Sequence, residues 1–367
     1  MPVANNRCTQ RQQRLWDSLR SLHPPCDAML ITSLPNVRYL TGFTGSNGIA
    51  LVTGSGTWLF SDPRYQFQAA QQVTGPGHAK AKVVKGPLLE QAAQMMNRRH
   101  WKSLGIEQDD ITAGALDALH SNSTGRHEFV PRSGQVEKLR MLKSSEELDA
   151  IRQSVQTNSR ALDAALHVLK GGMTEAELAA EIEYQMRKLG AEKPSFDTIV
   201  ASGKRSALPH ASPTRAVIDP GVLLIDMGAF ENGYASDMTR TFFVGTVSRE
   251  LRRMYKAVLE AQLAAIDAVR AGVTAHAVDN AARKVLKGHG LDKAFMHSTG
   301  HGLGLEIHEP PKLGRKDETR LEPGMAVTVE PGAYVENVGG VRIEDTIVVT
   351  ANGCEVLTPT PKDLLVI

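Results

Sequence analysis

Apolar and polar residues alternate along this chain in two different ways, and the pattern changes after about the first third of the sequence. Residues 27–130 carry short apolar runs separated by turn-forming clusters, which is typical of a compact domain that alternates strands and helices. The pattern predicts strands in 27–43, 48–62, 81–86 and 102–108, and helices in 87–101 and 112–120. This part of the chain is therefore expected to be an α/β domain.

The second pattern begins after a polar, turn-rich stretch at 121–134. From residue 144 onward, apolar residues recur at three- and four-residue spacing, which predicts amphipathic helices. Ser144 with Glu147, and Thr174 with Glu177, have the spacing of helix-capping boxes. We therefore expect two domains, 1–137 and 138–367, and the second should mix helices with strand pairs.

The second domain contains an internal echo. Residues 167–190 resemble residues 267–290: each is a helix end, a glycine, a threonine two residues later, and a second helix that closes with glycine. Gly172 corresponds to Gly272, and Thr174 to Thr274. The echo predicts a duplicated α+β half related by a pseudo-twofold axis. Chance similarity between two amphipathic helices is the alternative.

The composition of the chain indicates which binding partners and which cellular compartment to expect. The 367 residues are 41% hydrophobic with a net charge of +2, so nothing indicates binding to nucleic acid or to an acidic membrane. No apolar run approaches the roughly 20 residues that span a bilayer. The basic N-terminus lacks the apolar stretch of a secretory signal; an exposed opening helix is favoured over a transit peptide. Three widely spaced cysteines fit a reducing cytoplasm.

Two aspartates stand in a predicted hairpin. Residues 221–245 form two β-rich runs around Glu231-Asn232-Gly233. A loop at 231–232 would place Asp226 directly opposite Asp237, whereas a loop at 232–233 would place them diagonally on the same face. Two carboxylates on one face of apolar strands repel each other and lose hydration, so a positive group is expected between them.

A second strand pair, in 324–349, also carries acids in apolar surroundings. On its second strand Arg342 and Glu344 share a face, and Asp345 points away. Together with Glu330 and a histidine from the segment 297–311, the chain offers four carboxylates and one imidazole. This set suits Mn²⁺, Co²⁺ or Zn²⁺ and exceeds the needs of one catalytic zinc. Two ions, with a bridging hydroxide as nucleophile, fit the charge better.

These residues resemble the pita-bread metallopeptidases. The shared features are an Asp, a second Asp eleven positions on (237 − 226), a GHGxG histidine, and the glutamates of TVEPG and VRIED. Within that family the chain is similar to the Xaa-Pro branch, aminopeptidase P and prolidase. The likeness covers about 138–367, and the segments 36–48 and 60–69 resemble the branch's creatinase-like N-terminal domain. It implies an α/β N-terminal domain followed by an α+β pita-bread catalytic domain.

The resemblance also implies roles for particular residues. The implied metal ligands are Asp226, Asp237, His301, Glu330 and Glu344, with Asp237 and Glu344 bridging two ions. Glu330 would double as general base and acid. His210, His297 and His308 match histidines that line the pocket and contact the substrate, and Arg342 would position the substrate or Glu344. The family further implies manganese (cobalt or zinc are alternatives), Xaa-Pro peptides as substrates, and a cytoplasmic homodimer.

The two activities of the branch differ in substrate length. Prolidases cut dipeptides and hold the proline carboxylate with a basic residue before the EPG motif. Here the loop 311–324 offers Arg315, Lys316 and Arg320 without a clear motif match. The N-terminal segments favour aminopeptidase P. A binding protein that has lost catalysis is a remote alternative, because the chain keeps all five ligands. No HExxH, GxSxG or complete P-loop motif is present.

Overall fold

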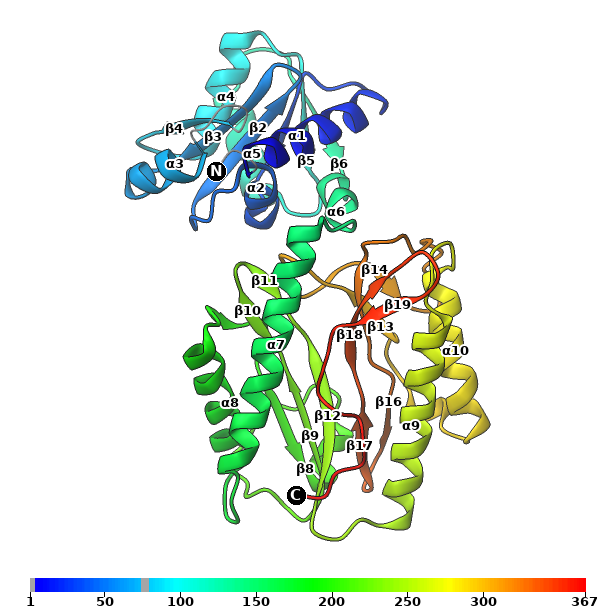
Figure 1. Cartoon of the computed structure of the whole chain (residues 1–367). Helices are drawn as coiled ribbons and strands as arrows, with labels where there is room; N and C mark the ends of the chain where they lie inside the picture. Colours follow the sequence, from blue (N-terminus) through cyan, green and yellow to red (C-terminus); the bar gives the residue numbers. More distant parts are fainter. Residues whose placement is uncertain (1–3, 74–78) are drawn as a thin grey trace. The chain divides into compact units, whose positions relative to one another are not determined.

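The structure, a computed structural model, describes residues 4–73 and 79–367 (Figure 1). The chain packs as two compact units, Met1–Arg140 and Met141–Ile367, which we call the N-terminal unit and the C-terminal unit. In the described residues no helix is both long enough and apolar enough to cross a membrane.

The N-terminal unit has one sheet of six strands in the order β4-β3-β2-β1-β5-β6. The pairs β1–β2 and β2–β3 are antiparallel, and the pairs β3–β4, β1–β5 and β5–β6 are parallel. Its elements are α1 (Ala4–Arg20), β1 (Ala28–Ile31), α2 (Leu34–Thr41), β2 (Gly48–Thr53), β3 (Gly56–Ser61), α3 (Gln66–Val73), β4 (Lys80–Val83), α4 (Leu88–Arg99), β5 (Ser103–Glu107), α5 (Ala113–Asn122), β6 (Glu128–Arg132) and α6 (Gln135–Arg140), with a 3₁₀ turn at Pro63–Tyr65. The predicted α/β domain is confirmed.

Two details of the strand prediction were wrong. The apolar run 27–43 is not one strand: it ends at Ile31, and Leu34–Thr41 forms the helix α2. The helix signals were present, since Pro35 lies in the first turn and Gly42 closes the helix with φ of 76°. The polar stretch 121–134 also contains the strand β6, which pairs in parallel with β5. The opening helix is present as α1, although Leu15 and Leu19 on it are buried.

The C-terminal unit is built from two similar halves. In each half a long helix is followed by a shorter one, and the pairs α7–α8 and α9–α10 flank the strands between them (Figure 1). The helices are α7 (Ser145–Val168), α8 (Glu175–Leu189), α9 (Arg249–Ala268) and α10 (Ala275–Gly288). The strands are β7 (Lys193–Pro194), β8 (Ile199–Ser202), β9 (Gly221–Met227), β10 (Ala229–Glu231), β11 (Tyr234–Ala235), β12 (Met238–Val244), β13 (Gly300–Gly302), β14 (Glu309–Leu313), β15 (Ala326–Val329), β16 (Gly332–Val335), β17 (Gly339–Arg342), β18 (Asp345–Val349) and β19 (Cys354–Val356), with 3₁₀ turns at Gly203–Ala207 and Asp292–Ala294.

The similar sequence segments 167–190 and 267–290 also have similar structures. Gly172 and Gly272 adopt φ of 86° and 83°, a left-handed conformation that favours glycine. Thr174 and Thr274 are the N-caps of α8 and α10, and each side chain accepts a hydrogen bond from the third residue of its helix. The predicted capping boxes at Ser144 and at Thr174 are both formed. The pseudo-twofold repeat is therefore confirmed.

The aspartate hairpin closes with the loop at 232–233. Asn232 and Gly233 have φ of 52° and 80°, the left-handed pair that a two-residue hairpin turn requires. The resulting register pairs Asp226 with Thr239, so Asp226 and Asp237 lie diagonally. Of the two loops that the sequence left open, the structure adopts the second.

One buried acid organises the N-terminal unit. Glu107, at the end of β5, accepts hydrogen bonds from the backbone N–H groups of Thr32 (2.6 Å) and Ser33 (2.8 Å), just before α2. Its other oxygen accepts from the amide of Asn36 (2.7 Å). The Glu107 side chain thus fixes the two residues that precede α2 and a side chain of its first turn.

We expect Glu107→Ala to destabilise the N-terminal unit by about 2–4 kcal/mol, because it removes the acceptor from three donors, each buried or half-buried. Urea unfolding followed by circular dichroism measures the change. The same substitution at Glu128, which is exposed on the neighbouring strand β6, is the matched control and should cost less than about 0.5 kcal/mol. Equal stability of the two variants would contradict the role of Glu107.

Candidate metal centre and active site

The acids of the predicted site lie where the strand ribbons are interrupted. Asp237 falls between β11 and β12, Glu330 between β15 and β16, and Glu344 between β17 and β18. Asp226 is the second-last residue of β9, just before the break at Gly228. At such a break the chain passes from one sheet to another, so each acid side chain is directed into the space between sheets.

His301 reaches this space from β13. Its neighbours Gly300 and Gly302 are required by close packing: a Cβ would lie 2.0 Å from the Thr328 carbonyl oxygen at Gly300 and 2.2 Å from that of Pro310 at Gly302. The glycines that flank His301 therefore allow the neighbouring strands to pack closely. The Nδ1 of His301 lies 3.0 Å from the Gly302 carbonyl oxygen, so Nε2 is the ring nitrogen that faces the acids and could bind a cation.

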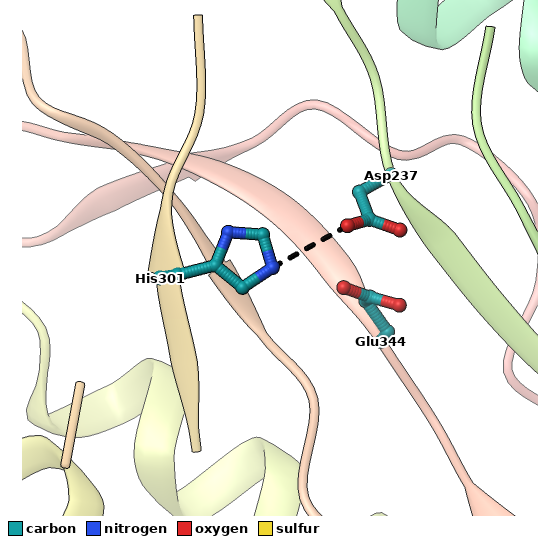
Figure 2. A group of neighbouring side chains, drawn as sticks. All are labelled: Asp237, His301 and Glu344. Carbon is teal, nitrogen blue, oxygen red and sulfur yellow. Dashed lines mark ion pairs between the residues drawn. The ribbon is translucent and has the colours of Figure 1, made fainter. Parts of the chain in front are cut away.

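Three of the predicted ligands form one compact group. Asp237, His301 and Glu344 offer ligand atoms that all lie within 4.8 Å of one another (Figure 2). Glu330 borders the group, with Oε1 3.4 Å from His301 Nε2, while Asp237 Oδ2 lies 3.5 Å from the same nitrogen. Figure 2 shows the three labelled side chains pointing toward one another from three separate strand segments.

Arg342 joins the fourth acid, Asp226, to the group. It donates to Asp226 Oδ2 (2.7 Å) and, through Nε, to the Thr239 hydroxyl (2.9 Å). That hydroxyl in turn donates to Glu344 Oε2 (2.7 Å). Arg342 and Glu344 therefore lie on the same side, as predicted. Asp345 belongs to a separate buried cluster. Its carboxylate accepts hydrogen bonds from the side chains of Arg240 (2.8 Å), Gln262 (2.9 Å) and Lys362 (2.6 Å).

The donor set fits divalent cations. Burial raises the pKa of Asp226, Asp237 and Glu344 above the ordinary carboxyl range, and neighbouring carboxylates raise it further. Asp226 Oδ1 and Glu344 Oε1 are buried and have no hydrogen-bond partner among the described residues. Buried acids with free oxygens, arranged around an imidazole nitrogen, have the chemistry of a metal site.

The predicted pocket histidines lie around the same space. His297 donates from Nδ1 to the Ser298 carbonyl (2.8 Å), so its Nε2 accepts from the Tyr334 hydroxyl (2.9 Å). That hydroxyl accepts from Arg342 (2.5 Å). Burial lowers the pKa of His297 and of His308, which favours neutral rings. The His308 ring packs edge-on against His301, with centroids 4.5 Å apart.

A cavity of about 1670 Å³ opens onto the group. All the predicted site residues line it: His210, Asp226, Asp237, His297, His301, His308, Glu330, Arg342 and Glu344. Of the four basic residues in the loop 311–324, Lys312, Arg315 and Lys316 also line this cavity. Arg320 instead donates to the Gly272 carbonyl (2.8 Å). The structure thus separates Arg315 and Lys316, which line the cavity, from Arg320, which holds a turn.

The sequence interpretation missed Tyr334, Thr239 and Thr328. Tyr334 links Arg342 to His297, and Thr239 links Arg342 to Glu344. The Thr328 hydroxyl accepts from the His301 N–H (3.1 Å) and donates to Glu330 (3.2 Å). Thr328 begins the TVEPG motif, Thr239 follows Asp237 by two residues and Tyr334 follows Glu330 by four. A single Tyr or Thr in a strand is nevertheless usually explained by ordinary packing. Only the register between strands indicates these roles.

Comparison with known proteins agrees with this geometry. Residues 149–351 match metallopeptidase family M24, and residues 11–142 match the creatinase/prolidase N-terminal domain. The chain is 38% identical to a Xaa-Pro dipeptidase of Pyrococcus furiosus, over 92% of this chain and 95% of that one. A Xaa-Pro dipeptidase structure from Bacillus anthracis superposes with a TM-score of 0.94 at 40% identity, covering 98% and 100% of the two chains. An X-Pro aminopeptidase structure from Thermotoga maritima gives 0.88 at 35% identity, covering 97% and 100%.

The two-domain fold and the buried acid-and-histidine group define a metal-dependent peptidase with a pita-bread catalytic domain. The chain belongs to metallopeptidase family M24, in the branch that contains the prolidases and the X-Pro aminopeptidases.

Because the acids at this site repel one another, the metal-free protein should be less stable than a variant that lacks one of them. We expect Glu344→Gln to raise the stability of the chelator-stripped protein by about 1–2 kcal/mol, because it removes one buried negative charge. Adding Mn²⁺ should stabilise the unmodified chain by about 2.7 kcal/mol at one hundred times Kd and stabilise the variant much less. Thermal unfolding with and without Mn²⁺ measures both effects. A variant that gains as much from Mn²⁺ as the unmodified chain would show that Glu344 is not a ligand.

Proposed function

We propose that this chain hydrolyses Xaa-Pro dipeptides with the help of two divalent metal ions, manganese being favoured. The single observation that carries the choice of dipeptides is that Arg315 and Lys316 line the same cavity as the buried acids. The peptide bond before proline is a tertiary amide with no N–H, so the substrate must be recognised through its ends and its ring. A dipeptide ends in a carboxylate next to that ring, and paired basic side chains suit it.

Asp226, Asp237, His301, Glu330 and Glu344 would hold the ions, and Asp237 and Glu344 would be shared between them. The ions, when bound, would polarise the scissile carbonyl and make water a nucleophile at neutral pH. Support comes from the cluster geometry, from the free oxygens of Asp226 and Glu344, and from the His301 Nε2 that faces the acids.

The other side chains would manage protons and charge. Glu330 would accept a proton from the attacking water and pass it to the proline nitrogen as the C–N bond breaks. Thr328 holds the Glu330 carboxylate for this transfer (3.2 Å). His210 and His308 line the cavity and would donate hydrogen bonds to the carbonyl oxygen as it gains negative charge. Arg342 would keep Asp226 and Glu344 in place, since it contacts one directly and the other through Thr239.

X-Pro aminopeptidase activity is the second candidate. The cavity, at about 1670 Å³, exceeds the usual 300–1,000 Å³ of a small-ligand site and leaves room for a longer peptide. The Thermotoga maritima structure, solved as an X-Pro aminopeptidase, also resembles this chain closely. This was the activity that the N-terminal segments favoured.

The three cysteines are unpaired, which supports a reducing compartment. We propose the cytoplasm as the site of action and a homodimer as the assembly, the latter on the family resemblance. Light scattering on the purified protein tests the assembly: a mass near 80 kDa, twice the 39.8 kDa chain, is expected.

Substrate length is tested by restoring Mn²⁺ to stripped protein and comparing an Xaa-Pro dipeptide with an Xaa-Pro-Xaa tripeptide. We expect dipeptide cleavage that disappears without metal. Arg315→Gln should raise the dipeptide KM about 10–100-fold, because it removes a charge-assisted hydrogen bond worth about 1.5–3 kcal/mol. Lys316→Gln should act in the same direction.

Arg320→Gln, in the same loop but outside the cavity, is the control and should leave the KM unchanged. Tripeptide cleavage without dipeptide cleavage would establish the second candidate. If neither peptide is cut with Mn²⁺ present, the remaining hypothesis is that the protein is a binding protein with a pita-bread fold and no catalytic activity.

His210 provides a separate test of the transition-state donors. It is exposed in the cavity wall, so His210→Ala should leave folding and Mn²⁺ affinity intact. We expect kcat to fall about 10²–10³-fold, as for loss of one oxyanion donor. Steady-state kinetics and Mn²⁺ titration measure the two quantities, and His289→Ala, an exposed histidine of the C-terminal unit, is the control. An unchanged kcat would remove His210 from the mechanism.

A further inference from the structure

We propose that Asp279 and Arg283 of α10 are positioning residues that set the metal affinity of the site by holding the segment 295–301. The inference rests on the proposed ligand roles of His301 and Glu330. Neither Asp279 nor Arg283 belongs to a motif of the sequence, and both lie on a helix rather than on the strands that carry the acids.

Asp279 reaches two ligands through one residue. Its side chain is fully buried (0% exposed), and its Oδ1 accepts from the backbone N–H (3.1 Å) and the hydroxyl (2.8 Å) of Thr299. The carbonyl of Thr299 accepts from the N–H of Glu330 (2.7 Å). His301 follows Thr299 by two residues. A shift of Thr299 would therefore displace both the histidine ligand and the backbone of Glu330.

Arg283 fixes the other end of the segment. Nε donates to Asp279 Oδ2 (2.7 Å), and a terminal nitrogen donates to Oδ1 (3.1 Å), so the pair is bidentate. The remaining N–H groups donate to the carbonyls of Phe295 (3.2 Å) and His297. The guanidinium also lies over the Phe295 ring, 4.2 Å from its centroid, and His297 packs edge-on against that ring at 5.0 Å. One ion pair thus holds the backbone on both sides of His297.

The geometry differs from that of a simple helix salt bridge. An exposed i, i+4 pair contributes a few tenths of a kcal/mol and needs no partners beyond itself. Here the carboxylate is fully desolvated, and each member of the pair makes two of its four hydrogen bonds to the segment 295–301. Ligand-orienting residues of this kind typically change metal affinity 10–100-fold when altered.

The first half contains a similar buried pair at positions that the repeat does not make equivalent. Glu175 of α8 is also fully buried and accepts from Ser202 N–H (2.8 Å) and from the hydroxyl of Thr214 (2.8 Å). Arg205 donates to Glu175 (3.1 Å) and to the Ser212 carbonyl (2.8 Å). This acid–arginine pair holds the segment 202–214, which bears His210 and none of the proposed metal ligands. It therefore supplies a control of similar chemistry.

The test compares Arg283→Lys with Arg205→Lys, since each substitution keeps the charge and removes the carbonyl contacts. Mn²⁺ affinity of the stripped protein is measured by competition with a chromophoric chelator, and the visible absorption of the Co²⁺-loaded protein reports ligand geometry. We expect Arg283→Lys to weaken the affinity of at least one site 10–100-fold and to alter the Co²⁺ spectrum. Arg205→Lys should keep the Mn²⁺ affinity of the unmodified chain while lowering kcat/KM.

Thr299→Val is the second variant, because it removes one hydroxyl contact and preserves volume and the backbone N–H. It should weaken Mn²⁺ binding in the same direction by a smaller factor, with the unfolding temperature of the metal-free protein within about 4 °C of the unmodified chain.

Unchanged affinity in both Arg283→Lys and Thr299→Val would overturn the proposal, as would an equal loss in Arg205→Lys. The readout is independent of peptide cleavage. A chain that binds Mn²⁺ but cuts no Xaa-Pro peptide would contradict the proposed function and leave this inference standing.

Discussion

The site depends on one constraint: four carboxylates share a buried volume in which they cannot all be ionised without added positive charge. Arg342 supplies one cation and is already paired with Asp226. The pKa of Asp237 and of Glu344 is raised well above the ordinary range by burial and by the neighbouring acids. Divalent ions bound by these acids would resolve this conflict, because ligation would replace the lost hydration and offset the repulsion. The strand breaks, the glycines and the arginine network all serve to hold these acids where they would otherwise separate.

The duplicated architecture explains how acids from distant parts of the chain meet. Each half provides a helix pair and an interrupted strand ribbon, and the ribbons lie side by side: Thr241 and Arg342 exchange two hydrogen bonds, and Glu344 N–H donates to the Thr239 carbonyl (3.2 Å). Only the second half adds the histidine segment. The halves are therefore alike in their backbone framework but not in their chemistry. The buried acid–arginine pairs at Asp279 and Glu175 stand at different positions of the repeat and support segments with different roles.

Much of the fold was predictable because its signals are local. Capping boxes, the Asn-Gly turn and the two Gly-x-Thr helix starts depend on a few consecutive residues, and all appear in the structure. The strand predicted over 34–41 was wrong because an apolar run is compatible with either a strand or a buried helix. The residues that decide for the helix are Pro35 at its start and Gly42 at its end. The strand β6 was missed because it is an edge strand with few apolar residues, formed by pairing with β5.

By itself the sequence determined which chemistry this protein could carry: acids inside apolar strands, one histidine between obligatory glycines, and the family to which their order belongs. The tertiary structure decided which side chains are in contact. It sets the diagonal register of Asp226 and Asp237, and it brings Tyr334 into hydrogen-bonding distance of Arg342 and His297. It also places Arg315 and Lys316 in the cavity wall, whereas Arg320 holds a turn. Local residue patterns specify elements and faces. Distances between side chains on different sheets follow from strand register and from the packing of the two halves, which no short stretch of sequence contains.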